Sequence, residues 1–166
     1  MEVFRITKAK FADQLYASGV EGRWNQRGEE VIYTASSRSL ACLENLAHKG
    51  GRGGIETFRT MVIYVPDRLA VQHINLRNLQ TGWNQITLHK QCQQIGSDWY
   101  VAKDTPVLKV PSAVIPDEFN YVLNARHPEF KEIKLIAVLP FAFDKRLWED
   151  IEDLQNQLDS LRKKES

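Results

Sequence analysis

The chain has 166 residues, 43% of them hydrophobic and 26% charged, which fits one folded, soluble domain over residues 1–166 and excludes a disordered or membrane-spanning chain. The 22 basic and 21 acidic side chains leave a formal net charge of +1, so no net charge attracts the chain to nucleic acid or to an anionic membrane.

The first third of the chain predicts a strand, a helix, a glycine-rich loop, a strand and a second helix. Phe11, Leu15 and Tyr16 recur at helical spacing before Gly19, which is typical of a short amphipathic helix. The predicted elements are a strand over Val3–Ile6, a helix over Lys8–Ser18, a loop through Gly22 and Gly28, a strand over Val31–Thr34, and a helix capped by Ser36 or Ser37 that runs to Lys49.

The rest of the chain predicts four strands and two more helices. A flexible connector over Gly50–Gly54 comes first, and Asn120–Asn124 reads as loop-like sequence. The predicted strands are Thr57–Val65, Ala70–Ile74, Val107–Val110 and Leu135–Leu139, with a helix over Thr87–Ile95 that Gly96 ends. Leucine and isoleucine at three- and four-residue steps predict an amphipathic terminal helix over 147–164, which packs on its own domain or else binds a partner or a second copy.

Cysteine usage and the first residues indicate a reducing compartment. Cys42 and Cys92 are the only cysteines and have no paired CxxC spacing, so we expect neither a disulfide framework nor a zinc site. His73, His89 and His127 lack metal-ligand spacing, and we expect no metal. No signal peptide and no run of about 18 apolar residues is present, so the expected location is the cytoplasm.

Two segments carry side chains suited to a phosphorylated aromatic ligand. In Gly22–Asn25, Arg23 offers the planar fork of donors that matches phosphate oxygens, although an arginine in a polar loop is more often a solvated surface residue. Glu44 and His48 lie one turn apart on the predicted helix, with Glu44 at the edge of its apolar face. A half-buried carboxylate of this kind indicates function, whereas a Glu–His surface pair is the structural alternative.

Three polar residues follow or lie near the predicted strand over Val107–Val110. Ser112 has no GxSxG surroundings and no assignable Ser-His-Asp pattern, so a ligand hydrogen bond is a better interpretation than a nucleophile. Asn120 and Asn124 are further candidates for ligand contacts, although loop amides often bond only their own backbone.

Taken together, these motifs resemble the RES domain, a family named for its arginine, glutamate and serine. The resemblance covers nearly the whole chain in the family's order. Its segments are Phe4–Ile6, Gly22–Asn25 with Gly28, Val31–Thr34, Leu43–Glu44 with His48, Gly82–Trp83, Ile95–Trp99, Val110–Ala113, Asn120–Asn124 with His127–Pro128, and Phe143–Leu147.

The resemblance implies an α+β fold like that of ADP-ribosyltransferases, with mixed sheets around a central cleft and helices packed outside. It also implies a toxin that degrades NAD as its substrate by hydrolysis or phosphorolysis, and an Xre-type helix-turn-helix antitoxin as the partner. The alternatives are an ADP-ribosyltransferase that modifies a protein, an inactive relative, and a non-enzymatic interaction module, which the near-zero net charge disfavours as a nucleic-acid binder.

Carried over residue by residue, the resemblance places the family's catalytic residues at Arg23, Tyr33, Glu44 and Ser112. It implies NAD contacts from Arg23, Tyr33, Ser112, Asn120 and Asn124. The chain departs from the family pattern at Glu21, where a glycine is usual, and at Ala125, where a proline is usual. The first departure puts in doubt only the loop that holds Arg23.

Overall fold

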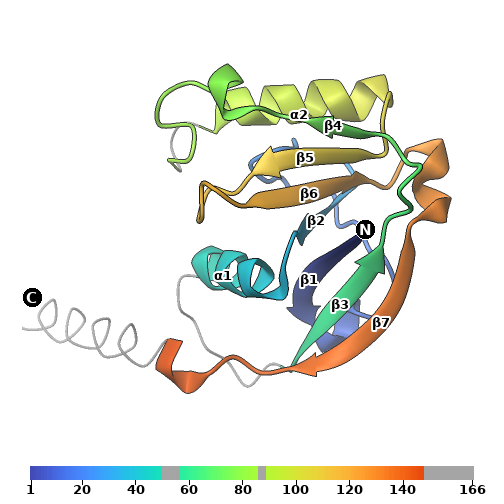
Figure 1. Cartoon of the computed structure of the whole chain (residues 1–166), viewed down its shortest axis with the longest axis vertical. Coiled ribbons are helices and arrows are strands. Elements are labelled where there is room, and N and C mark those ends of the chain that lie inside the picture. Colours follow the sequence, from blue (N-terminus) through green and yellow to red (C-terminus); the bar gives the residue numbers. More distant parts are fainter. Residues whose placement is uncertain (50–56, 86–88, 148–166) are drawn as a thin grey trace, which may run out of the picture.

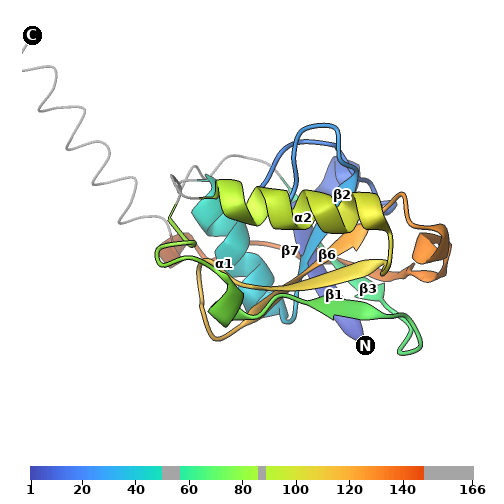
Figure 2. The ribbon, with the colours of Figure 1, turned by 90° about the horizontal axis from the view of Figure 1, so that it is seen from above.

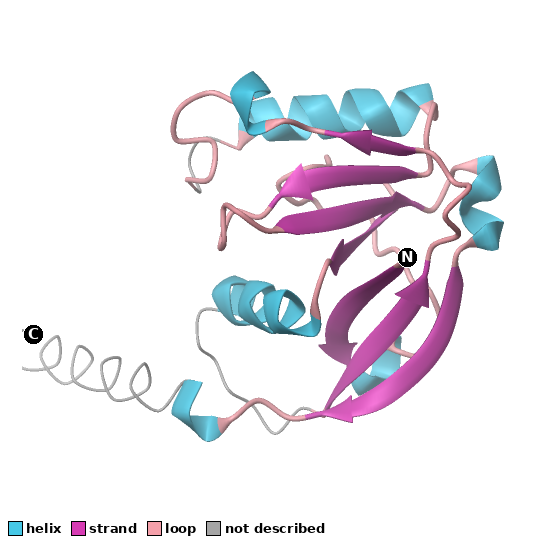
Figure 3. Ribbon diagram, viewed as in Figure 1, coloured by secondary structure: helices cyan, strands magenta, loops and turns pink. Residues whose placement is uncertain are grey.

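The computed structural model describes residues 1–49, 57–85 and 89–147. Within them, seven strands form one sheet in the order β4-β5-β6-β2-β1-β3-β7, and two α-helices accompany it (Figures 1 and 3). The strands are β1 Glu2–Lys8, β2 Val31–Ala35, β3 Phe58–Tyr64, β4 Val71–His73, β5 Val107–Pro111, β6 Phe119–Asn124 and β7 Lys134–Phe141, and the helices are α1 Arg38–Lys49 and α2 Lys90–Ala102. The α+β class predicted from the sequence is confirmed.

The sheet consists of two halves that meet at a narrow seam. One half is β4-β5-β6-β2 and the other is β1-β3-β7, and Figure 1 shows the first above the second. At the seam, β1 and β2 are paired only where Phe4 lies opposite Ala35, whereas β1 pairs with β3 along its whole length. The mixed sheets expected around a cleft are therefore two halves of one continuous sheet.

Both α-helices pack on the same face of the sheet. Cys92 and Trp99 of α2 join a cluster with Leu108 and Val122 of the first half. α1 covers the seam through Leu40 and Ala41, which pack against the following residues: Ile6, Ala35 and Phe58. Figure 2, seen from above, shows the two helices on this side. The opposite face carries a third cluster that includes Val3, Ile32, Met61 and Leu123.

The helix predicted over Lys8–Ser18 is wrong. Only Ala9–Phe11 form one 3₁₀ turn, and the backbone N–H of Ala9 donates to the carbonyl of Thr57 at 2.9 Å. Phe11 and Tyr16 are 41% and 44% exposed and stack on each other. Their helical spacing therefore does not mark a face that packs into the core, and burial is what normally stabilises a short helix.

The helix predicted over Thr87–Ile95 occurs as α2, but the end predicted for it before Gly96 is wrong, because α2 continues to Ala102. Lys103, at φ 54°, ends it in the left-handed conformation. Gly96 is buried against the loop before β2, where an added Cβ would lie 1.9 Å from the carbonyl oxygen of Trp24. The glycine therefore permits a close approach between helix and loop instead of stopping the helix.

The loop-like interpretation of Asn120–Asn124 is likewise wrong, because these residues form most of β6 between β2 and β5. The strands that the sequence does predict all occur within two residues of their expected bounds, and Ser37 caps α1 by accepting from the N–H of Leu40 at 3.0 Å. The connector Gly50–Gly54 and the terminal helix from residue 148 onward lie outside the described residues. Among the described helices, none combines the length and apolar character needed to cross a membrane.

Candidate active site

The fold gathers four of the sequence-predicted site residues on the sheet face that carries the helices. Strand pairing places Tyr33 opposite Val122 and Ala35 opposite Asn120, and because side chains alternate between faces, Tyr33 and Asn120 lie on one side. Ser112 directly follows β5, and Glu44 lies on α1, which packs against this face.

Glu44, Ser112 and Asn120 form one hydrogen-bonded cluster. Oε1 of Glu44 accepts from the Ser112 hydroxyl at 2.7 Å and from the Asn120 amide nitrogen at 2.5 Å. Glu44 is half-buried, as its position at the edge of the apolar helix face predicts. In the part of the chain that the structure describes, Oε2 accepts no hydrogen bond. One oxygen of the carboxylate is thus held while the other is left for a ligand or solvent.

Ser112 lies behind Glu44, out of contact with solvent. Its exposed fraction is 0%. The hydroxyl oxygen accepts from the backbone N–H groups of Val114 and Ile115 at 3.1 and 2.9 Å, which closes a turn after β5. Its single hydrogen goes to Glu44. The sequence predicts a ligand hydrogen bond for Ser112, but the structure directs that hydrogen to a carboxylate.

Arg23 contacts a turn that precedes α2. Nη1 donates to the carbonyls of Trp83 and Gln85 at 2.6 and 3.2 Å, and Nη2 donates to that of Asn84 at 2.9 Å. The guanidinium also lies 5.9 Å from the centre of the Trp83 ring. The guanidinium has five N–H donors, and these carbonyls occupy three of them. A phosphate can therefore bind Arg23 only by replacing carbonyl partners or by using the other donors of the guanidinium.

The Tyr33 hydroxyl fixes the loop that carries Arg23. It accepts from the N–H of Trp24 at 2.8 Å and donates to Oδ1 of Asn25 at 2.8 Å. Burial raises the pKa of Tyr33 far above its ordinary value, so the phenol stays neutral. Because its hydrogen is used within the loop, the hydroxyl has none left to donate to a ligand, and the partly buried side chain packs against the cluster that includes Trp24 and Val122.

Asn25 belongs to the Gly22–Asn25 motif, but the sequence assigns it no catalytic or binding role of its own. It is fully buried, and its amide nitrogen donates to the carbonyls of Val20 and Gln26, both at 2.9 Å. Gly22 allows the close packing, because a Cβ there would lie 2.7 Å from the Tyr33 hydroxyl. The available signal was its position two residues after Arg23, within the Gly22–Asn25 motif.

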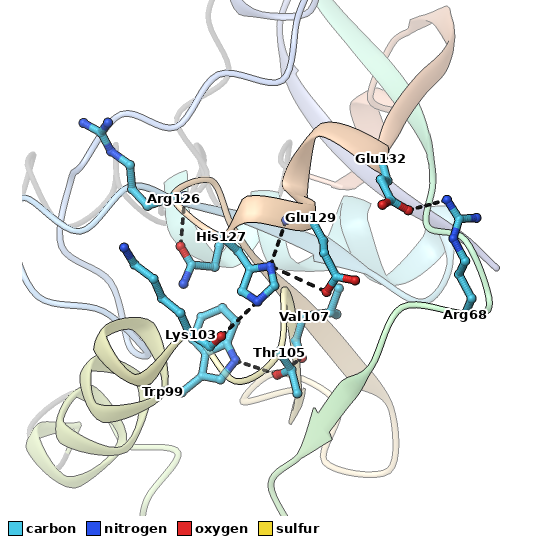
Figure 4. A network of polar contacts seen from close by, with 10 residues as sticks. Arg68, Trp99, Lys103, Thr105, Val107, Arg126, His127, Glu129 and Glu132 are labelled. Carbon is cyan, nitrogen blue, oxygen red and sulfur yellow. Dashed lines mark hydrogen bonds and ion pairs between the residues drawn. The ribbon is translucent and has the colours of Figure 1, made fainter.

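Asn124 lies away from this cluster, at the other end of β6. Four residue steps along the strand separate it from Asn120, about 13 Å. It is fully buried and its amide nitrogen donates to the carbonyl of Tyr100 at 3.1 Å, which ties β6 to α2. Figure 4 shows a network at this end, where His127 lies between Glu129 and the carbonyl of Lys103. The structure thus places Asn124 in the buried contact between β6 and α2 instead of beside Glu44.

Comparisons with known proteins agree on one family. The RES domain model matches residues 2–144. The "Prs ADP-ribosylating toxin" of Sphingobium sp. (strain YBL2) is 37% identical over 142 residues, which cover 82% of this chain and 88% of that protein. "Toxin Res" of Photorhabdus laumondii subsp. laumondii is 32% identical over 152 residues, covering 89% of this chain and 97% of that protein.

A solved structure supports the fold. The crystal structure of the M. tuberculosis MbcT-MbcA toxin-antitoxin complex contains a chain that superposes with a TM-score of 0.70 at 20% sequence identity. The match covers 85% of this chain and 84% of that chain.

Proposed function

The chain belongs to the RES-domain family, and from that premise we propose that it cleaves the nicotinamide–ribose bond of NAD, as the toxin of a toxin–antitoxin pair. The two curated relatives described above carry the word toxin in their names. The resemblance to this family implies the substrate and the bond, and a fixed carboxylate is suited to that cleavage.

The observation that carries the proposal is the half-buried Glu44 carboxylate held by Ser112 and Asn120. Nicotinamide leaves NAD as a neutral base, so its departure needs no acid. The ribosyl centre then becomes oxocarbenium-like, as in glycoside cleavage. A preorganised anion beside that centre stabilises the developing positive charge, and such stabilisation is commonly the largest catalytic contribution.

Arg23 and Tyr33 serve substrate binding in this proposal. Arg23 holds the pyrophosphate, or an incoming phosphate, by exchanging part of its bonds to the 83–85 carbonyls. Tyr33 offers its ring to the nicotinamide or ribose, while its hydroxyl keeps the Arg23 loop in place. No metal takes part in this mechanism.

The first experiment measures NAD consumption by the purified protein with and without inorganic phosphate, with products separated by chromatography. We expect nicotinamide together with ADP-ribose or its 1-phosphate, which identifies water or phosphate as the acceptor. Glu44→Gln should keep NAD binding and lose at least about 100-fold in kcat, the scale of removing one preorganised charge-stabilising group. The matched control is Glu2→Gln, an exposed carboxylate on β1. Unchanged turnover in Glu44→Gln would rule out the carboxylate role.

Transfer of ADP-ribose to a protein is the second candidate. The 37% identical relative named as an ADP-ribosylating toxin favours it, and it uses the same site residues. Incubation with NAD labelled in the adenylate part separates the two activities. Label on a co-incubated protein supports transfer, and label only in free ADP-ribose or its phosphate supports NAD degradation.

The partner in this proposal is a cytoplasmic antitoxin of the Xre helix-turn-helix type. The structural relative comes from a toxin-antitoxin complex. Coexpression of the chain with an Xre-type helix-turn-helix antitoxin should give a stable complex in which NAD consumption is suppressed. Full activity of the saturated complex would contradict this assignment.

A further inference from the structure

The hydrogen of the Ser112 hydroxyl has a fixed direction. Two backbone N–H groups, those of Val114 and Ile115, donate to the oxygen and occupy its acceptor positions. The only hydrogen of the group therefore points away from them, and it meets Oε1 of Glu44 at a heavy-atom distance of 2.7 Å. Because Ser112 is 0% exposed, a ligand cannot take the place of Glu44 without a rearrangement of the turn.

Asn120 supplies a second donor from the neighbouring strand. Pairing of Val110 with Asn120 brings the end of β5 beside the start of β6, so Ser112 and Asn120 meet Glu44 together. The orientation of the amide is also fixed, because a flip would place Oδ1 against Oε1 and set two acceptors 2.5 Å apart. It keeps this orientation although Oδ1 is buried without a partner among the described residues.

From this geometry we propose that Asn120 and Ser112 are positioning residues that hold Oε1 of Glu44, so that Glu44 meets its ligand through Oε2 alone. Neither residue touches substrate, which replaces the NAD contacts predicted for both. The geometric part stands on the cluster itself, and its catalytic consequence rests on the proposed function. Oε2 is then the oxygen that faces the ribosyl centre, at an angle set by the two donors on Oε1.

The arrangement explains what each variant of Glu44 should do. In Glu44→Gln, the amide oxygen takes the place of Oε1 and accepts from Ser112 and Asn120, while the NH₂ group replaces Oε2. This variant keeps the cluster and loses only the reacting oxygen and its charge. Glu44→Ala loses the cluster as well.

The catalytic test compares Asn120→Leu and Ser112→Ala with wild type. We expect kcat to fall about 10- to 100-fold in each, the range for partners that orient an active-site ligand, with the KM for NAD within about 2-fold. Added to Glu44→Gln, Asn120→Leu should cause no further loss, because the reacting oxygen Oε2, which the held Oε1 orients, is already gone. The matched control is Asn45→Leu, which also removes a partly buried amide. Asn45 lies on α1 and donates to the carbonyl of Ile6, not to Glu44. It should keep kcat within about 3-fold.

A rise in KM at constant kcat would overturn the proposal, because it would make Asn120 a substrate contact. So would a multiplicative loss in the double variant. Either result would leave NAD cleavage itself intact.

A stability cycle tests the same geometry without NAD. Asn120→Leu and Glu44→Ala, alone and together, are compared by urea unfolding. The two changes should be coupled by about 10-fold or more in the unfolding constant, as for a hydrogen bond to a charged group. Coupling in a protein that leaves NAD intact would retain the positioning role and reject only the proposed function. Strictly additive effects would overturn the positioning role whatever the substrate is.

Discussion

Arg23 has two competing sets of hydrogen-bond acceptors, the carbonyls that it contacts in the structure and the phosphate of the proposed substrate. Its guanidinium closes on the carbonyls of Trp83, Asn84 and Gln85, yet the proposed reaction asks it to hold phosphate. Both tasks use the same planar set of donors. Binding of NAD is therefore expected to change the 83–85 turn along with Arg23.

Arg23→Ala should raise the KM for NAD by about 10- to 100-fold, the equivalent of one charge-assisted hydrogen bond of about 1.5–3 kcal/mol. Steady-state kinetics over a range of NAD concentrations measures it. Arg27→Ala is the matched control, since Arg27 lies in the same loop with its side chain 85% exposed. If the KM of Arg23→Ala equals that of wild type, Arg23 does not contact the phosphate.

Tyr33→Phe should lower the free energy of unfolding by about 1–3 kcal/mol. The change leaves the N–H of Trp24 and Oδ1 of Asn25 without their shared partner, and buried polar groups left unpaired cost about that much. Urea denaturation followed by tryptophan fluorescence measures the loss. Tyr64→Phe, at a 40% exposed position, should stay within about 0.5 kcal/mol of wild type. Equal stability of the two variants would show that the Tyr33 hydroxyl does not hold the loop.

The sequence identifies the residue types of the site better than their bonds. Glu44 was predictable as a half-buried carboxylate because its position on α1 follows from helical spacing. Which group Ser112 bonds depends on the turn to Val114 and Ile115, and on a helix 68 residues earlier in the chain. The sequence treats Asn124 and Asn120 alike because the segment reads as a loop. In the structure they lie at opposite ends of the strand β6.

At the scale of elements, α2 and the Arg23 loop pack closely because Gly96 of α2 has no side chain. Replacing a glycine by alanine in the interior of a helix normally stabilises the helix by about 1 kcal/mol. Here the new methyl group would lie 1.9 Å from the carbonyl oxygen of Trp24, so we expect a net loss of about 1–3 kcal/mol instead. Because Trp24 follows Arg23, turnover should fall too.

Thermal unfolding and NAD kinetics of Gly96→Ala check both effects. Val101→Ala, on the same helix at 72% exposure, controls for a change in helix propensity. A stabilised Gly96→Ala protein would mean that α2 and the loop are not in close contact.

Local patterns predicted elements wherever burial follows them. β1, β2, β3 and α1 have apolar positions that do enter the core, so their spacing was a reliable guide. In Lys8–Ser18, Phe11 and Tyr16 are exposed, and Ala12 and Leu15 pack into the core without forming a helix. Gly96 has the residue type of a helix end without its geometry. In both cases a tertiary contact decides, with Thr57 in one and Trp24 in the other.

At the scale of the molecule, the burial of tyrosine hydroxyls and cysteine thiols predicts that the folded state loses stability at alkaline pH. Burial is the main cause that raises the pKa of each of four groups, Tyr33, Cys42, Cys92 and Tyr121. The folded protein keeps these protons at pH values where the unfolded chain has released them. Their contribution is complete below the ordinary pKa values of 9.0 and 10.0 and declines as the pH rises through them.

The free energy of unfolding should therefore fall as the pH rises above roughly 9, with Tyr33, the most deeply buried of the four groups, contributing most and the partly exposed Cys42 and Tyr121 contributing less. Urea titrations at stepped pH values measure the slope. In Tyr33→Phe the slope should be shallower, because one of the four groups is missing. An identical slope in the variant would exclude Tyr33 as a contributor.

The strand order has a consequence for the nascent chain. β2 carries Tyr33, but its neighbours are β1 from the start of the chain and β6 from residues 119–124. Asn120, the last of the clustered residues to be translated, reaches Glu44 only after 76 further residues have been added. At about 5–20 residues per second, a ribosome takes several seconds over that interval. During this time the growing polypeptide cannot contain the assembled carboxylate cluster, so a cell that makes this protein encounters the arrangement only late in each round of translation.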